Sequence, residues 1–406
     1  MRKYRKNESS FRKKYLFLPH TITLPMKNPT FNLLLELLGR LLSRHSGLDS
    51  NEEIAAIGHP SPEQWSEVIS LSEQMQVSEL LYDAVFKLGP TQRPDNETMM
   101  RWTARVVETE RSNRLYRHQL YSMFDHLTET RVTPIVMKGI TLANLYPNPE
   151  HRPVGDVDLF VPLDVQHTYI KCFEKLGAQI SSAFDLKHLS LQCLGMNWEL
   201  HFRSIKFYSQ RTDRRYGILE AEETSRDSLF HETFDDHKVA VFPPILNLVY
   251  LTAHLQHHLL VEQANLRQII DWMFALQHDR TALAIKEQAF VNQLKKLGLY
   301  RLYRCLGAIG VNYLGLSADS YAGLSRLTKL DKKRGEYLLK IILQGHVPGG
   351  KPYEPRLDSD TLLKRLGHFA ELTKRCFALR GICPRESLAT PFGFIYHAIR
   401  RRLRKK

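Results

Sequence analysis

The stretch HRPVGDVDLFVP, residues 151–162, places two aspartates one residue apart within an apolar run. Residues i and i+2 of a strand project from the same face of a sheet, so we expect Asp156 and Asp158 to lie side by side. Val157 and Leu159 then point to the other face. Adjacent carboxylates repel each other unless a cation lies between them. The stretch therefore predicts a strand with a cation site on one face.

Around this stretch, the spacing of hydrophobic residues alternates between the patterns of strands and of helices. TPIVMKG, residues 133–139, is a short apolar run, and KHLSLQC and NWELHFRS read as two further strands around a turn at Gly195. ITLANLY is long enough for two helical turns, and LDVQHTYIKCFEKLG predicts an amphipathic helix that Gly177 ends. Strands that alternate with helices favour a small mixed β-sheet with helices packed against it. The predicted fold class is α+β.

Helical patterns precede and follow this core. The segment SPEQWSEVISL begins with Ser61 in an N-cap position and Pro62 in the first turn, and a long charged helix is expected over residues 97–130. From residue 244 the pattern is helical almost to the end. The predicted organisation is as follows: a basic tail without ordered structure over 1–30, an N-terminal helical region over 31–130, an α/β core over 131–240, a C-terminal helical domain over 241–391 and a basic tail over 392–406.

Composition limits the classes of protein that the chain can belong to. Its 406 residues are 43% hydrophobic and 25% charged, which is typical of a globular protein, and no apolar run reaches the length of a membrane span. Its five cysteines are scattered, which favours reduced thiols and a cytoplasmic location.

The net charge of +14 is concentrated at the ends of the chain. Residues 1–25 and 400–406 each carry +6, which leaves +2 for the rest. We therefore expect no broad basic face and no long nucleic acid as partner. Basic tails are usually solvated, but weak contact of these tails with an anionic membrane stays open.

The paired aspartates suit Mg²⁺ or Mn²⁺. Mg²⁺ takes oxygen ligands in octahedral geometry and keeps positions open for substrate phosphates. Gly155 would let the backbone and a polyphosphate come close. Glu199 in NWELHF is a third acid among apolar and aromatic residues, on another predicted strand. Two ions held about 3.5–4 Å apart by such acids can activate an attacking oxygen and stabilise the leaving one.

Together these motifs resemble the nucleotidyltransferase superfamily related to DNA polymerase β, and most of all a bacterial branch of nucleotidyltransferase family proteins. The resemblance rests on Lys138-Gly139 after a strand, then Arg152, GDVDLFV, and ELHF preceded by His188. It is close over about residues 131–205 and looser to about residue 276. It implies that Asp156 and Asp158 are the metal-binding pair, that Glu199 is the third acid, and that Lys138 and Gly139 replace the glycine turn that holds the nucleotide's phosphates.

The phosphate-holding turn departs from the superfamily pattern. The wider superfamily has Gly-Gly or Gly-Ser there and a shorter spacer to the acids, whereas here Ile140 follows the glycine and sixteen residues separate Gly139 from Asp156. Lys138, Thr141 and Arg152 are available as replacement donors.

Several histidines lie near these motifs. For His188 and His201, hydrogen bonding in the core and contact with substrate both stay open. His254 and His258 have the i, i+4 spacing of metal ligands, but no glutamate follows His254 as in HExxH, so histidines lining a cleft are favoured over zinc. Two charged residues of the next predicted helix are expected to pair in that cleft or to meet the substrate: Arg267 and Asp271.

The function predicted from these residues is Mg²⁺-dependent transfer of a nucleoside monophosphate from an NTP to an acceptor hydroxyl, with release of pyrophosphate. Two alternatives stay open: a catalytically inactive nucleotide-binding or regulatory protein, and a peripheral membrane component. The second rests on FGFIYHAIRRRLRKK, residues 392–406, where aromatic residues adjoin a basic cluster. The sequence leaves the acceptor and the preferred base open.

Overall fold

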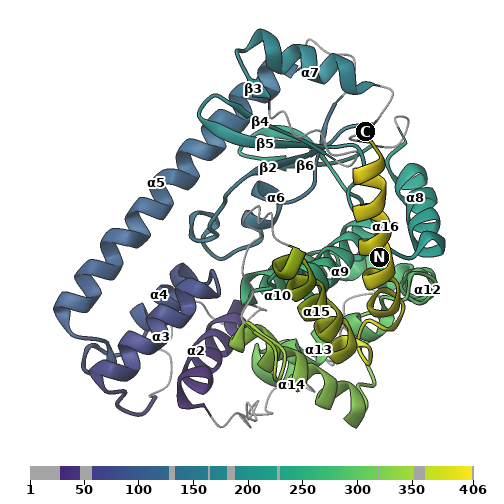
Figure 1. Ribbon diagram of the computed structural model, residues 1–406. Coiled ribbons are helices and arrows are strands. Elements are labelled where there is room, and N and C mark those ends of the chain that lie inside the picture. The colour runs from purple at the N-terminus through teal and green to yellow at the C-terminus, as the bar shows by residue number, and fades with distance from the viewer. Residues whose placement is uncertain are drawn as a thin grey trace, which may run out of the picture.

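The computed structural model describes residues 28–45, 57–127, 133–162, 165–180, 188–225, 229–317, 321–351 and 362–404. Within them a mixed β-sheet forms the upper part of the molecule in Figure 1, and helices fill the lower part. The architecture is α+β, which confirms the predicted fold class. Most of the predicted N-terminal tail and residues 405–406 of the C-terminal tail lie outside the described residues.

The sheet has seven described strands in the order β3-β4-β5-β2-β1-β7-β6. At its centre β2 pairs antiparallel with β1 and parallel with β5, which sets Asp158 opposite Glu199. The strands are β1 Ile135–Val136, β2 Val157–Phe160, β3 Gln179–Ile180, β4 His188–Cys193, β5 Met196–His201, β6 Phe230–Phe234 and β7 His237–Val241.

One face of the sheet packs against helices α5 (Asn96–Leu127) and α7 (Gln166–Lys175). Val157 and Leu159 are fully buried in this core, and the ring of Phe173 contacts Trp198 edge-on at 5.3 Å between centroids. Because side chains alternate along a strand, Asp158 and Glu199 project from the opposite face. Asp158 and Glu199 therefore lie next to each other on that face.

The opposite face looks onto the helical body. The N-terminal helices α2 (Pro29–His45), α3 (Pro62–Gln74) and α4 (Ser78–Phe86) share one apolar core with the C-terminal helices. Ser61 caps α3 through a capping box with Gln64, and Pro62 occupies the first turn, as predicted.

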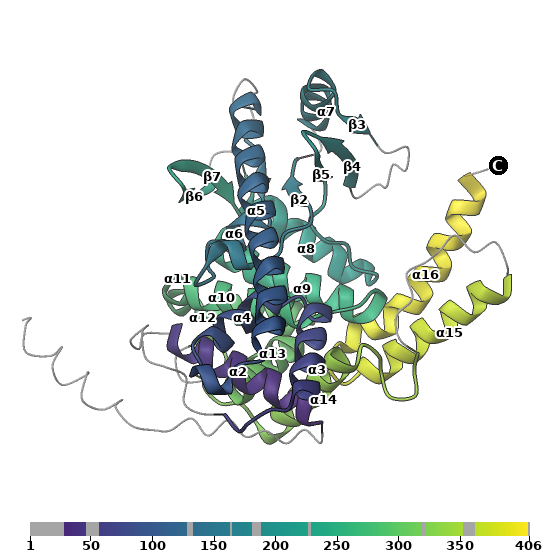
Figure 2. The same ribbon diagram turned by 90° about the vertical axis from the view of Figure 1, so that its left-hand side faces the viewer.

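The C-terminal helices are α9 Pro244–Val261, α10 Leu266–His278, α11 Arg280–Ile285, α12 Glu287–Leu297, α13 Tyr300–Tyr313, α14 Lys329–Gln344, α15 Leu362–Leu379 and α16 Pro384–Arg404. Helices α15 and α16 project from the body to one side (Figure 2). None of the described helices is both long and apolar enough to cross a membrane. The five cysteines are unpaired.

Three elements near the sheet were not predicted. Helix α8 (Gln210–Glu223) begins at Ser209, whose side chain accepts a hydrogen bond from the Thr212 backbone N–H. The edge strand β3 pairs with β4. The hairpin β6–β7 turns at Asp235 and Asp236, both with positive φ, and adds two strands to the edge next to β1. Short helical segments at α6 (Ile140–Ala143), Pro90–Gln92 and Pro149–His151 complete the described elements.

Candidate active site

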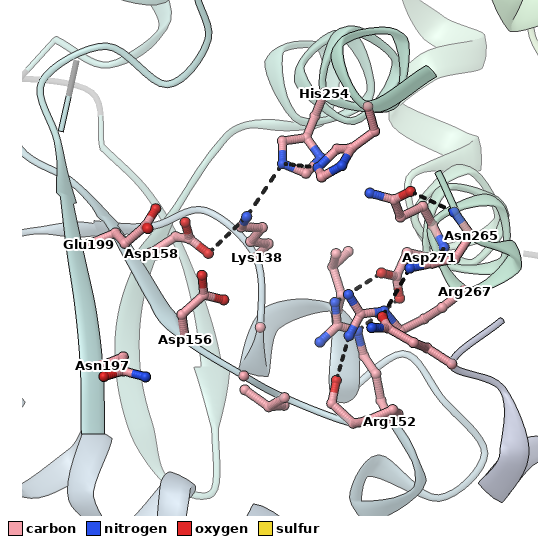
Figure 3. Close-up of a pocket in the computed structure, with 18 of the residues that line it drawn as sticks. Lys138, Arg152, Asp156, Asp158, Asn197, Glu199, His254, Asn265, Arg267 and Asp271 are labelled. Carbon is pink, nitrogen blue, oxygen red and sulfur yellow. Dashed lines mark hydrogen bonds and ion pairs between the residues drawn. The ribbon is translucent and has the colours of Figure 1, made fainter. Parts of the chain in front are cut away.

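Three carboxylates meet on the open face of the sheet. Asp158 and Glu199 face each other across β2 and β5, and Asp156 comes directly before β2. Oxygens from the three side chains lie within 4.8 Å of one another. Figure 3 shows the three acids on one side of a pocket, with Asp156 and Asp158 directed into the open space. The structure thus brings together the three acids singled out in the sequence.

Of the three acids, Asp158 has the closest positively charged neighbours. Its side chain is 1% exposed, yet the Lys138 ammonium lies 3.1 Å from Oδ2, and His201 Nε2 lies 2.8 Å from Oδ1. Burial alone would raise the pKa of Asp158, but these two cationic partners outweigh it and hold the pKa at about 2. For Asp156, burial and the neighbouring Asp158 raise the pKa. The carboxylate of Asp156 therefore lacks a sufficient positive partner.

A divalent cation fits this arrangement. Asp158 Oδ2 is buried and makes no hydrogen bond of acceptable geometry; its close neighbour is the Lys138 ammonium. Carboxylate oxygens gathered on one cavity wall are hard ligands of the kind that Mg²⁺ and Mn²⁺ prefer. The residues that would hold the ion are Asp156, Asp158 and Glu199.

Two histidines lie beside the Glu199 carboxylate. His201 Nε2 lies 3.1 Å from Glu199 Oε2, and His188 Nε2 lies 3.9 Å from Oε1. The hydrogen bond from His201 lowers the pKa of Glu199. His188, Glu199 and His201 also form a second group whose ligand atoms lie within 4.8 Å of one another. The structure places both histidines beside the acids, and neither is among the described residues that line the cavity.

The Lys138-Gly139 turn requires glycine. Gly139 has φ 78° and ψ −113°, a backbone conformation that side chains rarely allow, and an added Cβ would lie 3.0 Å from the Tyr116 hydroxyl. That hydroxyl donates a hydrogen bond of 2.9 Å to the backbone oxygen of Asp156. Tyr116 thus connects the turn with the acids, although nothing in the sequence distinguishes it from other residues of a charged helix.

Gly155 and Thr141 differ in their access to the cavity. Gly155 lines the cavity, and a Cβ added to it would meet no atom within 4 Å. Room for a ligand against the backbone is therefore present. Thr141 is half-buried in α6 and is not among the described residues that line the cavity.

The far side of the cavity holds a buried ion pair. Arg152 is 4% exposed; its Nε donates to Asp271 Oδ1 at 2.8 Å and its Nη2 donates to Oδ2 at 2.9 Å. The hydroxyl of Tyr146 also donates to Asp271. The ion-pair partner of Asp271 is therefore Arg152 and not Arg267. The loop before β2 brings Arg152 to α10. The third nitrogen of the Arg152 guanidinium, Nη1, takes no part in this ion pair and is available to a ligand.

Arg267 adds a second guanidinium to this wall. Its Nη1 donates to the Pro153 backbone oxygen at 2.7 Å, whereas its buried Nε has no hydrogen-bond partner. Burial and the nearby charge of Arg152 lower the pKa of Arg267. Two guanidiniums next to the single carboxylate of Asp271 leave an excess of positive charge at the cavity wall (Figure 3).

His254 lies between the two sides. Its Nε2 is 3.4 Å from the Lys138 ammonium and 3.3 Å from His258 Nε2, and His258 Nδ1 in turn lies 2.9 Å from Glu262. Burial and the Lys138 charge hold the pKa of His254 well below its usual value, so the ring is neutral. A neutral ring can accept a hydrogen bond from Lys138 and keep its ammonium next to Asp158.

The cavity has a volume of about 1380 Å³. Pockets for single small ligands usually measure about 300–1,000 Å³, so this one has room for two substrates. Its walls come from the sheet, from α9 and α10, and from the N-terminal helices, which the sequence did not connect with the site. The N-terminal side chains that line it are Glu73, Gln76, Ser78, Glu79, Arg105 and Thr109.

Comparison with known proteins identifies the family. A family model described as "Uncharacterised nucleotidyltransferase" matches residues 61–312. The match includes the N-terminal helices that line the cavity, the whole sheet and helices α9 and α10. No curated protein and no solved structure matches the chain. The matched region is well over half of the chain, so the protein belongs to this nucleotidyltransferase family and is a transferase enzyme.

Proposed function

We propose that the protein transfers a nucleoside monophosphate from an NTP to an acceptor hydroxyl and releases pyrophosphate, with Mg²⁺ or Mn²⁺ as cofactor. The observation that carries the proposal is the convergence of Asp156, Asp158 and Glu199 on one wall of a large cavity. Nucleotidyl transfer, the general reaction of the family, fits such a cluster because phosphate chemistry commonly depends on metal ions held by carboxylates.

The three acids would bind the divalent ion, and their combined negative charge explains why they need it. The chemistry that a bound divalent ion supplies is neutralisation of charge on the transferring phosphate and activation of the acceptor oxygen. Everything else in the step depends on how the chain binds and orients the two substrates.

Lys138 and the two glycines would hold the phosphates nearest the acids. The ammonium of Lys138 lines the cavity between Asp158 and His254, where it can donate to a phosphate oxygen. Gly155 leaves the backbone accessible beside it, because the space where a Cβ would stand is open, and Gly139 also lines the cavity. This arrangement would replace the missing Gly-Ser pair of the wider superfamily.

Arg267 would bind the more distant phosphates. Its Nε is buried and unpaired at the cavity wall, and Arg152 Nη1 lies in the same cluster. A triphosphate that extends from the acids toward α10 would offset the excess positive charge there, and charge-assisted hydrogen bonds to a guanidinium are among the stronger polar contacts. Asp271 would act by positioning Arg152 and would not contact the substrate.

We further propose a small acceptor. The part of the cavity away from the acids is lined by the N-terminal helices and by α9 and α10. Residues 26–399, between the basic ends, carry a net charge of about +2, which offers little attraction to a long nucleic acid.

The test is a screen of the four NTPs with Mg²⁺ or Mn²⁺ for pyrophosphate release, with and without extract as a source of acceptor. We expect one or more NTPs to be consumed by the wild type and turnover to fall by about a thousandfold or more in Asp156→Ala. Equal turnover by the correctly folded variant and the wild type would rule out the assignment.

A further inference from the structure

Helix α16 presents large apolar side chains to solvent. Leu388, Phe392, Ile395 and Tyr396 are 69%, 75%, 43% and 54% exposed. Their spacing of four, seven and eight residues places them on one face of the helix. We call this set the α16 stripe. Contiguous exposed apolar surface of this kind is uncommon on a protein that has no partner there.

The opposite face of α16 is fixed to the body. The carboxylate of Glu386 accepts hydrogen bonds from the backbone N–H groups of Tyr208 and Ser209 at 2.8 and 3.1 Å. Thr390 is fully buried, and Gly393 lies so close to the Tyr208 ring that a side chain would collide with it. These contacts set the rotation of the helix about its axis, so the α16 stripe has to face outward.

Helix α15 extends the same kind of surface. Leu366 and Phe377 are exposed, and the Arg380 guanidinium stacks 3.7 Å above the Phe377 ring. Lys364 and Arg365, directly before Leu366, are exposed as well. In Figure 2 both helices project from one side of the body, where they would be accessible to a large flat partner.

The stretch of sequence that contains this surface also carries much of the chain's positive charge. Residues 364–406 contain twelve Lys or Arg and two Glu, a net charge of +10. Residues 1–25 carry +6, which leaves −2 for residues 26–363. The basic run RRRLRKK, residues 400–406, begins four residues after Tyr396 in the sequence. A partner of this surface must therefore combine apolar surface with negative charge.

We propose that the α16 stripe, together with the exposed Lys364 and Arg365 of α15, docks on the surface of an anionic lipid bilayer, to which the basic sequence of residues 364–406 adds attraction. A helix that lies in the membrane interface buries one apolar face among the acyl chains and directs Lys and Arg to anionic headgroups. The alternative of a second copy of the chain would bring two +10 segments together, which their repulsion opposes. The inference is independent of the proposed reaction.

The test is sedimentation of the full chain with phosphatidylcholine vesicles, with and without added phosphatidylserine. We expect binding that needs phosphatidylserine, weakens with added salt, and falls by about tenfold or more in Leu388→Ser/Phe392→Ser. The control variant is Ile285→Ser on α11, which removes an equally exposed apolar side chain outside the stripe and should bind like the wild type. Circular dichroism checks that each variant is folded.

Three results would overturn the inference. The first is a wild type that does not sediment with phosphatidylserine vesicles, and the second is unchanged binding of the double variant. The third is a dimer in light scattering that Leu388→Ser/Phe392→Ser dissociates, because a second copy would then cover the α16 stripe. Pyrophosphate release by the variants is expected to stay unchanged, since none of the substituted residues lines the cavity.

Discussion

Among single residues of the site, Gly139 is one where the backbone itself limits substitution. Gly139→Ala would place a Cβ 3.0 Å from the Tyr116 hydroxyl in a conformation that costs about 1–3 kcal/mol for a non-glycine residue. We expect reduced stability in urea unfolding and reduced nucleotide turnover. Adding Tyr116→Phe should recover part of the loss, because it removes the colliding atom but not the backbone strain. A fully active Gly139→Ala variant would contradict this account of the turn.

Asp279 is a buried acid whose charge opposes folding. It is 7% exposed, and burial raises its pKa to about 6 from a usual value of 3.8. The folded state therefore favours the neutral form: the stability that this group contributes is present below about pH 4 and is lost as pH rises through 6.

Asp279→Asn should accordingly stabilise the protein at neutral pH. The uncharged amide keeps an oxygen for the hydrogen bond from Asn247 and removes the buried charge. We expect a gain of about 1–2 kcal/mol at pH 7 and almost none near pH 4, measured by urea unfolding of both proteins at each pH. A gain that is the same at both pH values would show that the carboxylate is already ionised without cost in the folded state.

Residue types and spacing were sufficient to single out the acids and the neighbouring Lys138 and His201, but not how the side chains of the site pair with one another. Asp156, Asp158 and Glu199 are unusual because they interrupt apolar strands, and that signal is local. Tyr116 has no such signal, and its hydroxyl reaches Asp156 only because α5 crosses the sheet. Whether Asp271 pairs with Arg152 or with Arg267 likewise depends on the path of a loop far away in the sequence.

At the scale of elements, the loop before β2 is held by two helices. From α5, Asn113 donates to the backbone oxygens of Glu150 and Arg152 at 2.6 and 2.9 Å. From α10, Arg267 donates to Pro153 and Asp271 binds Arg152. The loop that delivers the two aspartates to the cavity is therefore fixed on both sides, which preorganises the acids.

Removing one side of that support should be costly. Asp271→Asn would leave the buried Arg152 guanidinium without its paired carboxylate, beside the second guanidinium of Arg267, and breaking a buried pair in this way costs about 3–5 kcal/mol. We expect a corresponding loss in urea unfolding. Glu97→Gln is the matched control, because its partner Arg101 is exposed and such pairs contribute about 1 kcal/mol or less. Similar losses in the two variants would contradict the structural role of Asp271.

The predicted and missed elements differ in how their residues are patterned. Strands β2, β4 and β5 are rich in apolar residues and are bounded by recognisable turns, and all three were predicted. The hairpin β6–β7 was missed because FHETF has three polar residues in a half-exposed edge strand, and HKVAV, which lies between β6 and β1, begins with two polar residues. Its turn at Asp235-Asp236 uses two aspartates with positive φ, where a glycine would have been a stronger signal.

At the scale of the whole molecule, the cavity brings together segments from most of the chain. Its walls combine residues 73–109, 138–158, 179–199 and 251–271. The sequence predicted the helical regions on both sides of the core, but not that the first of them would line the cavity. Burial of one apolar core shared by the N-terminal and C-terminal helices produces this arrangement, and such long-range packing has no local signature.

In the proposed function, the three acids tolerate one another because a divalent cation binds between them. Calorimetric titration of Mn²⁺ into the wild type, Asp156→Asn and Glu199→Gln tests it most directly, with Glu73→Gln as a control acid that lines the cavity outside the cluster. We predict binding to the wild type and to Glu73→Gln, and affinity at least about tenfold lower in the other two variants. Equal affinity in all four proteins would contradict the account.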